Sequence, residues 1–339
     1  MPHPYLVLFV VLSMSAVVGS SEKPTVDATS SGLLLVANKG DRTLGIVDPQ
    51  AGQQVAAVPE NDTTGHEVVA SPDGHTAYVP IYGNSGVGKP GTDGRAMLAI
   101  DIASRKLAGR VDFGHGVRPH CPIFNPVNGE LYVTTEIDNA VTVVDPQTLK
   151  VVGTIPTGKP ESHMLALSHD GLLGYTANVG SGTVSVLDLK ARRTITIIPV
   201  ATVVQRISIS PDDRMVFTSD QTKPQLAVID TATRKLKTWV TLPASGYGTA
   251  PTPDGHSLVV AMPAANKVAV VDLVSMKVVH TVEVPPAPQA VLITPDGKIA
   301  YVSCDQSHKI AAIRTSDWTV EKLIDAGKGA DGLAWASRR

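Results

Sequence analysis

The chain of 339 residues carries a net charge of −2, from 29 Lys and Arg against 31 Asp and Glu, and has no basic tail. This balance argues against nucleic acid or an anionic membrane as a partner. A hydrophobic content of 43% with only 4% aromatic residues predicts an aliphatic core of Val, Ile, Leu and Ala.

Residues 1–20 are expected to be a cleaved export signal. Their apolar run, Tyr5 to Met14, is followed by small residues, although no Lys or Arg precedes it. The run is too short for a comfortable membrane span and no later segment reaches span length, so an uncleaved signal anchor is the membrane alternative. Residues 21–31 are expected to form a linker. The expected location is periplasmic, secreted or at the cell surface.

From residue 32 onward, one repeat dominates the chain. Turn signals of the PDG type recur with spacings of 55, 42, 42, 42 and 42 residues, ending at Gly74, Gly129, Gly171, Asp213, Gly255 and Gly297. Within a unit, short apolar runs such as AVLIT, KIAYVSC and KIAAIR are divided by Asp, Gly, Pro and Asn, which is typical of strands and turns. Four strands per repeat of this length is the pattern of a β-propeller blade.

The two chain ends complete one blade. LAWASRR at the C-terminus is the first strand and turn of a unit, whereas GLLLVANKGDRTLGIVDPQAGQQVAAV supplies three strands without a first one. The sequence therefore predicts an all-β, seven-bladed β-propeller over residues 32–339, with four antiparallel strands per blade. Pairing of the C-terminal strand with the N-terminal strands is expected to close the ring and remove its exposed edge.

One polar position recurs six residues before the turn Pro of each blade, or its equivalent, just ahead of the first strand. Its seven occupants are His66, His120, His163, Gln205, Tyr247, Gln289 and Asp331. Because the first strand of a blade lines the central channel, these side chains are expected to encircle one mouth of it. Arg118, Glu161 and Arg206 flank the ring and make the mouth mixed in charge, which suits a polar or anionic small molecule.

Three interpretations of this ring stay open. Polar residues are expected at any hydrated channel mouth. His66, His120 and His163 are alternatively ligands of a transition metal such as Cu, Zn or Fe, because three imidazoles with an open position form a catalytic metal pattern. The third interpretation is a metal-free ligand pocket.

The one repeat with a spacing of 55 residues contains an insertion, YGNSGVGKPGTDGR, from Tyr82 to Arg95. It lies between the second and third strands of the second blade and is expected on the histidine-bearing face. Functional loops concentrate on such faces, so it is a candidate lid with Lys89 or Arg95 reaching a ligand. A plain surface insertion is the alternative.

Two segments, LYVTTEIDNAVTVVDPQTLKVVGTIPTGK and GYTANVGSGTVSVLDLK, resemble the YVTN-repeat, YncE-like and surface-layer-type β-propellers. The resemblance covers nearly all of residues 32–339 and implies an exported seven-bladed propeller, often without an assigned activity. Related seven-bladed scaffolds include lactonases, quinoprotein dehydrogenase subunits and copper reductases, so the fold does not decide the function.

The favoured hypothesis is an exported binding or interaction scaffold that holds a small molecule, metal or partner protein at the histidine-bearing mouth. The alternative is a metal-assisted or redox enzyme at the same mouth, quinoprotein-like or lactonase-like. A third hypothesis is a structural surface-layer component. No catalytic residue is assigned, because no GxSxG, HExxH or CxxCH motif is present.

Overall fold

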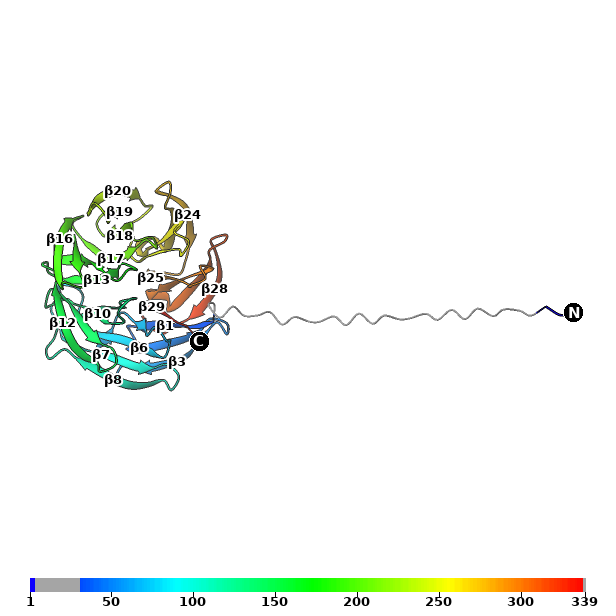
Figure 1. The fold of residues 1–339 in the computed structure, drawn as a ribbon, viewed down its shortest axis with the longest axis horizontal. Coiled ribbons are helices and arrows are strands. Elements are labelled where there is room, and N and C mark those ends of the chain that lie inside the picture. Colours follow the sequence, from blue (N-terminus) through cyan, green and yellow to red (C-terminus); the bar gives the residue numbers. More distant parts are fainter. Residues whose placement is uncertain (4–30, 338–339) are drawn as a thin grey trace.

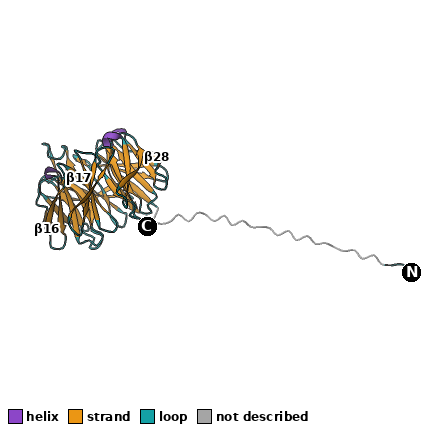
Figure 2. Ribbon diagram, turned by 90° about the horizontal axis from the view of Figure 1, so that it is seen from above, coloured by secondary structure: helices purple, strands orange, loops and turns teal. Residues whose placement is uncertain are grey.

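The computed structural model describes residues 1–3 and 31–337. Seven antiparallel sheets are arranged as blades of a closed ring (Figure 1), and the disc seen from its side consists almost wholly of strands (Figure 2). The predicted export signal and linker fall almost entirely on residues 4–30, outside the described residues, and stay predictions. Within the described ranges, no helix is long and apolar enough to cross a membrane.

Each blade runs outward from a strand at the channel to a strand at the rim. In this order, blade 1 comprises β29 (Ala330–Ser337), β1 (Gly32–Asn38), β2 (Thr43–Asp48) and β3 (Gln53–Pro59). Blade 2 comprises β4 (Thr64–Gly65) and β5 (Val69–Ala70), then β6 (Thr76–Gly83), β7 (Asp93–Asp101) and β8 (Lys106–Asp112). Blade 3 comprises β9 (Pro119–Phe124), β10 (Leu131–Thr135), β11 (Ala140–Asp145) and β12 (Lys150–Pro156). Blade 4 comprises β13 (Ser162–Leu167), β14 (Leu173–Asn178), β15 (Thr183–Asp188) and β16 (Arg193–Pro199).

The other three blades follow the same order. Blade 5 comprises β17 (Val204–Ile209), β18 (Met215–Asp220), β19 (Gln225–Asp230) and β20 (Lys235–Thr241). Blade 6 comprises β21 (Thr249–Pro251), β22 (Ser257–Met262), β23 (Lys267–Asp272) and β24 (Lys277–Glu283). Blade 7 comprises β25 (Pro288–Ile293), β26 (Ile299–Cys304), β27 (Lys309–Arg314) and β28 (Thr319–Asp325). Single 3₁₀ turns follow the second strands of blades 4, 6 and 7, namely η1 (Val179–Ser181), η2 (Pro263–Ala265) and η3 (Asp305–Ser307).

The predicted closure of the ring is confirmed. Strand β29 pairs antiparallel with β1, with Leu34 opposite Trp335 and Leu35 opposite Ala334. The C-terminal strand thereby becomes the channel strand of blade 1, whose other three strands come from the N-terminal end. These backbone hydrogen bonds join the two ends of the described chain in one blade and close the ring.

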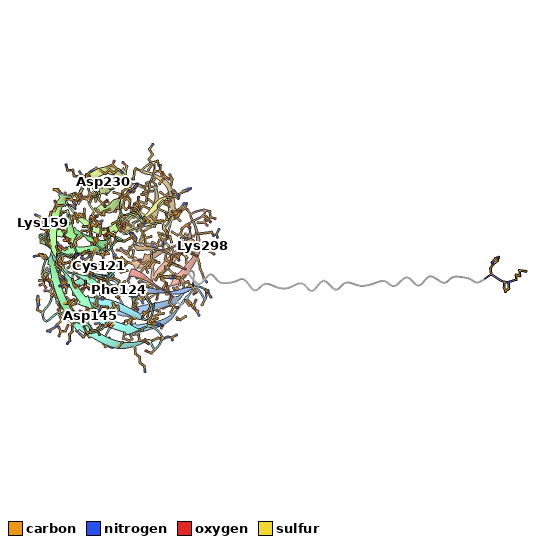
Figure 3. The ribbon with its side chains drawn as sticks, in the orientation of Figure 1. Cys121, Phe124, Asp145, Lys159, Asp230 and Lys298 are labelled. Carbon is orange, nitrogen blue, oxygen red and sulfur yellow. The ribbon has the colours of Figure 1, made fainter. Side chains whose placement is uncertain are left out.

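The core lies between neighbouring blades. The first strands pack on one another around the channel, while the middle strands are almost fully buried and the fourth strands are largely exposed. Cys121 lies nearer the middle of the disc in Figure 3, whereas the labelled charged residues Asp230 and Lys298 lie toward its rim. The aliphatic composition is reflected in clusters of Val, Leu, Ile and Ala from adjoining blades.

Two predicted boundaries are wrong. Five ring residues are the second residue of their channel strand rather than a residue ahead of it, because these strands begin earlier than expected. They are His120, His163, Gln205, Gln289 and Asp331, in β9, β13, β17, β25 and β29. The ends of the inserted segment are strand rather than loop. Strands β6 and β7 lengthen into both ends of it and pair as far as Gly83 opposite Asp93, so residues 84–92 form the loop and Arg95 belongs to β7.

Candidate functional site

A tight turn ahead of the channel strand places each ring residue at the mouth. Two positions before the ring residue, the backbone takes the left-handed conformation in blades 3, 4, 7 and 1, at Arg118, Glu161, Ala287 and Gly329. Three of these are not glycine, a conformation that costs roughly 1 kcal/mol or more and persists only where the surroundings hold it. The turn directs the next-but-one side chain toward the channel.

The three histidines of blades 2, 3 and 4 pack together. The rings of His120 and His163 are in contact, with centroids 3.7 Å apart and planes tilted by 31°, and both residues are about 2% exposed. His66 stacks on the fully buried ring of Tyr82 at 4.7 Å and meets His120 edge-on at 5.6 Å. The structure therefore brings these three predicted residues together, and their role as ligands stays a prediction.

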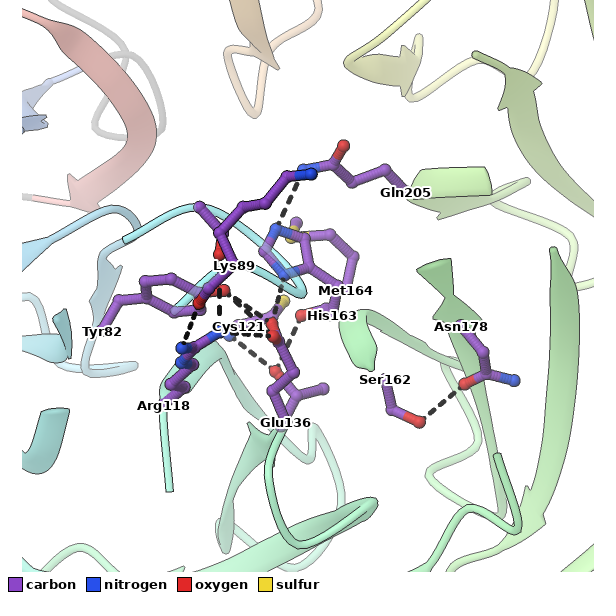
Figure 4. Close-up of polar contacts among 12 residues, drawn as sticks. Tyr82, Lys89, Arg118, Cys121, Glu136, Ser162, His163, Met164, Asn178 and Gln205 are labelled. Atoms are coloured by element: carbon purple, nitrogen blue, oxygen red, sulfur yellow. Dashed lines mark hydrogen bonds and ion pairs between the residues drawn. The ribbon is translucent and has the colours of Figure 1, made fainter. Parts of the chain in front are cut away.

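A buried carboxylate organises this cluster (Figure 4). Glu136, directly after β10, accepts a hydrogen bond from the Tyr82 hydroxyl at 2.9 Å, and its Oε2 lies 3.1 Å from Nδ1 of His163. The other ring nitrogen of His163, Nε2, lies 3.1 Å from the amide nitrogen of Gln205. Because an amide nitrogen only donates, Nε2 of His163 accepts and Nδ1 carries the proton that is donated to Glu136.

The imidazoles are held neutral. Burial lowers the pKa of His66 to about 4 and that of His120 well below the ordinary histidine value. Burial also lowers the pKa of His163, although the hydrogen bond to Glu136 acts in the opposite direction. Burial alone would raise the pKa of Glu136, but His163, Tyr82 and Arg118 hold it below the usual range. The result is a neutral, acceptor-capable histidine cluster beside an ionised carboxylate.

The other half of the mouth is an ionic cluster. Arg206 of blade 5 reaches across the channel and pairs with Glu67 of blade 2, and its Nη2 lies 2.8 Å from Oδ1 of Asp331 in blade 1. Lys39 pairs with Asp331 at 3.2 Å, and the ring of Tyr247 lies 5.0 Å from the guanidinium of Arg206. Burial raises the pKa of Glu67, whereas the Arg206 guanidinium acts in the opposite direction.

The loop of residues 84–92 covers this face. Arg118 donates to the carbonyl of Lys89 at 2.6 Å and pairs with Asp93 at 2.5 Å, while its Nη1 lies 3.6 Å from Oε1 of Glu136. A Cβ added at Gly88 would lie 2.5 Å from Oε1 of Glu161, so the loop reaches from blade 2 to blade 4. In the view of Figure 4, the Lys89 side chain runs toward Gln205. The loop thus has the position predicted for a lid.

Other predicted site residues have different surroundings. Arg95 lies on β7 and pairs with the exposed Asp112 at 2.9 Å, so it does not reach the mouth. Gln289 occupies the ring position in blade 7 without a side-chain hydrogen bond to any residue of 31–337. Within the described residues, no group of three or more His, Cys, Asp or Glu side chains could hold a metal ion. Both ring nitrogens of His163 are already engaged, one with Glu136 and the other with Gln205.

Sequence reasoning missed a second ring. The residue just after the second strand, or its register equivalent, is Lys39, Tyr82, Glu136, Val179, Gln221, Pro263 and Asp305 in blades 1, 2, 3, 4, 5, 6 and 7. Four of these seven, Lys39, Tyr82, Glu136 and Asp305, belong to the hydrogen-bond and ion-pair network of the mouth. Aligning the repeats at this position would have found them, because polar side chains gather there in blades 1, 2, 3 and 7.

Comparisons with known proteins locate the chain among propellers. Residues 128–336 match the family described as the cytochrome D1 heme domain. A chain of hydrazine synthase from Kuenenia stuttgartiensis has the same fold, with a TM-score of 0.72, 18% identity, and coverage of 89% of this chain and 99% of that chain. The dihydro-heme d1 dehydrogenase NirN, solved in complex with DHE, gives a TM-score of 0.66, 14% identity, and coverage of 93% and 77%. No curated protein matches.

Proposed function

The chain belongs to the cytochrome D1 heme domain family, and on this basis we propose that its channel mouth binds a heme-type iron tetrapyrrole and takes part in redox chemistry. This proposal corresponds to the redox alternative of the sequence hypotheses rather than to a generic scaffold. The finer resemblance to YVTN-repeat propellers stays a prediction.

The donor set of the mouth suits such a group. A heme iron needs only one or two protein ligands, and neutral imidazole is a common one. His66 is half-buried, its pKa is about 4, and neither ring nitrogen has a hydrogen-bond partner within residues 31–337. Nδ1 of His120 is likewise buried without a partner. This unsatisfied pair of histidines is the observation that carries the proposal.

The chain's own residues have distinct parts in this proposal. His66 supplies the ligand nitrogen, and Tyr82 stacks on it and limits its rotation. Glu136 holds the proton of His163 on Nδ1, so that Nε2 faces Gln205 as an acceptor. When bound, the iron macrocycle would supply one-electron chemistry that these side chains do not provide.

The test is a titration of the purified chain with heme d1, and with hemin in parallel, followed by visible absorption. We expect a saturable spectral change typical of histidine-ligated iron that is lost in His66→Ala and kept in His169→Ala. His169 is a matched control because it lies in the turn between β13 and β14 and pairs with Asp213 at 2.6 Å. Absence of a spectral change with both tetrapyrroles would refute the proposal.

A second candidate is a metal-free site for a polar small molecule. It is favoured by the charges of the mouth, because Arg118, Arg206 and Lys39 are each already paired with a carboxylate. A carboxylate-bearing macrocycle would have to compete with these internal pairs. If the tetrapyrroles fail to bind, Gln205 and His163 become the contacts to test with uncharged polar ligands.

Export to the periplasm or cell surface belongs to the same proposal. It rests on the apolar run from Tyr5 to Met14. Cell fractionation of the full-length protein, together with mass determination of its mature N-terminus, tests it. A full-length cytoplasmic product would contradict it.

A further inference from the structure

The loop of residues 84–92 brings a lysine to the histidine-bearing mouth. Lys89 is exposed, and its side chain runs toward Gln205 of blade 5 in the view of Figure 4. Within the described residues, its ammonium group forms no ion pair and no hydrogen bond. The carboxylate of Glu161 lies beside Gly88, where an added Cβ would be 2.5 Å from its Oε1, yet it is not paired with Lys89.

The backbone that carries Lys89 is held in place. Arg118 donates to the carbonyl of Lys89 at 2.6 Å, and its Nη1 lies 3.4 Å from the carbonyl oxygen of Gly86. The Lys89 N–H donates to the same Gly86 carbonyl at 3.0 Å and closes a turn. At the base of the loop, the Thr92 N–H donates to Oδ1 of Asn84 at 2.6 Å. These contacts fix the backbone of the loop and leave the ammonium group of Lys89 free to bind a ligand.

The other three cations described at the mouth already have carboxylate partners. They are Arg118 with Asp93, Arg206 with Asp331, and Lys39 with Asp331. An incoming anion would have to break one of these pairs. Breaking a buried pair leaves an uncompensated charge, which is strongly unfavourable. Lys89 is therefore the cation that can bind a negatively charged group without such a loss.

On the basis of the proposed function, we propose that Lys89 binds a carboxylate of the tetrapyrrole and makes the mouth selective for carboxylate-bearing members of that class. Gln205 is half-buried, and one N–H of its amide is directed at Nε2 of His163. The second N–H of the same amide is left for the ligand carboxylate. Hydrogen bonds from an ammonium to a carboxylate are charge-assisted and roughly twice as strong as neutral ones. The macrocycle would then be held at two points, its iron by His66 and its carboxylate by Lys89.

The probe is protoporphyrin IX, which has the carboxylates but no iron and so separates this contact from iron ligation. Its fluorescence on titration with the full chain should show saturable binding that Lys89→Gln weakens roughly five- to tenfold. Lys89→Arg keeps the charge and should restore binding. Added salt should weaken binding to the wild type more than to Lys89→Gln, since it screens the charge. Lys223→Gln is the matched control, because Lys223 is exposed in the equivalent turn of blade 5, and it should bind like the wild type.

Three results would overturn the inference: unchanged protoporphyrin affinity in Lys89→Gln, an equal loss in Lys223→Gln, or no binding to the wild type. A parallel titration with hemin keeps this inference apart from the proposed function. A histidine-ligated hemin spectrum with an affinity that does not depend on Lys89 would overturn this inference alone. Protoporphyrin binding that depends on Lys89, without such a hemin spectrum, would support this inference and overturn the iron ligation alone.

Discussion

Glu60 is a buried carboxyl whose ionisation should work against the fold. It follows β3, is 3% exposed, and its Oε2 accepts a hydrogen bond from the backbone N–H of Gly65 at 2.9 Å. Its Oε1 is buried without a partner. Burial raises the pKa of Glu60 to about 7 from an ordinary value of 4.5, so the folded protein keeps a proton here that the unfolded chain releases.

The sign and size of the effect follow from this difference. Below pH 4.5 the group is neutral in both states, and between pH 4.5 and 7 stability falls as pH rises, because the folded state binds more protons. Above pH 7 the full loss is reached, about 3 kcal/mol for the shift that burial produces. In Glu60→Gln the side-chain oxygen still accepts from Gly65 but cannot ionise, so the variant should gain about 2–3 kcal/mol over wild type at pH 8 and little at pH 5.

Urea unfolding of both proteins at pH 5 and pH 8 measures this difference. The channel histidines and Glu67 also contribute to the pH dependence of the free energy of unfolding. Their contributions cancel in the comparison, because both proteins contain them. Glu283→Gln is the control, because that side chain is 84% exposed on β24 and its replacement should have the same small effect at both pH values. An equal stability difference between Glu60→Gln and wild type at both pH values would refute the reasoning.

Three further predictions concern the mouth. Arg206→Met should cost about 3–5 kcal/mol in urea unfolding, because it strands two buried carboxylates, and adding Glu67→Gln should recover part of the loss; no recovery would contradict the ion pair. Glu136→Gln should lower the pKa of His163 further in an NMR titration, because Glu136 raises it, and a rise would contradict the assignment. Arg118→Ala should speed amide hydrogen exchange in the loop of residues 84–92, since it removes the hydrogen bond to the Lys89 carbonyl; an unchanged exchange rate would contradict a role for Arg118 in holding the loop.

The mouth and the seams between blades should respond independently to substitution. A redox role for the mouth depends on His66 and its neighbours, whereas the aliphatic clusters between blades concern the fold that carries them. Variants of the second kind, such as Val302→Ala in the cluster between blades 6 and 7, should leave a tetrapyrrole spectrum unchanged. Loss of the spectrum in a mouth variant can then be attributed to loss of cofactor binding rather than to loss of the folded structure.

Much of the architecture could be predicted because a propeller blade is a local unit. Each repeat contains its own strands and turns, so the PDG spacing and the half-units at the chain ends were enough to predict seven blades and the pairing of β29 with β1. The ring of His66, His120 and His163 followed from the same period. Residue spacing alone determines such positions, because equivalent residues of equivalent blades must face the same channel.

Only the tertiary structure decided what those residues touch. The pairing of Arg206 with Glu67 and Asp331 spans the channel, and the role of Glu136 depends on Tyr82 and His163 from two other blades. Such contacts depend on side-chain length, rotamer and burial among segments far apart in sequence, and a repeat carries no record of them. The sequence by itself thus determined the ring and its closure, whereas packing across the channel decided the protonation, partners and accessibility of the site.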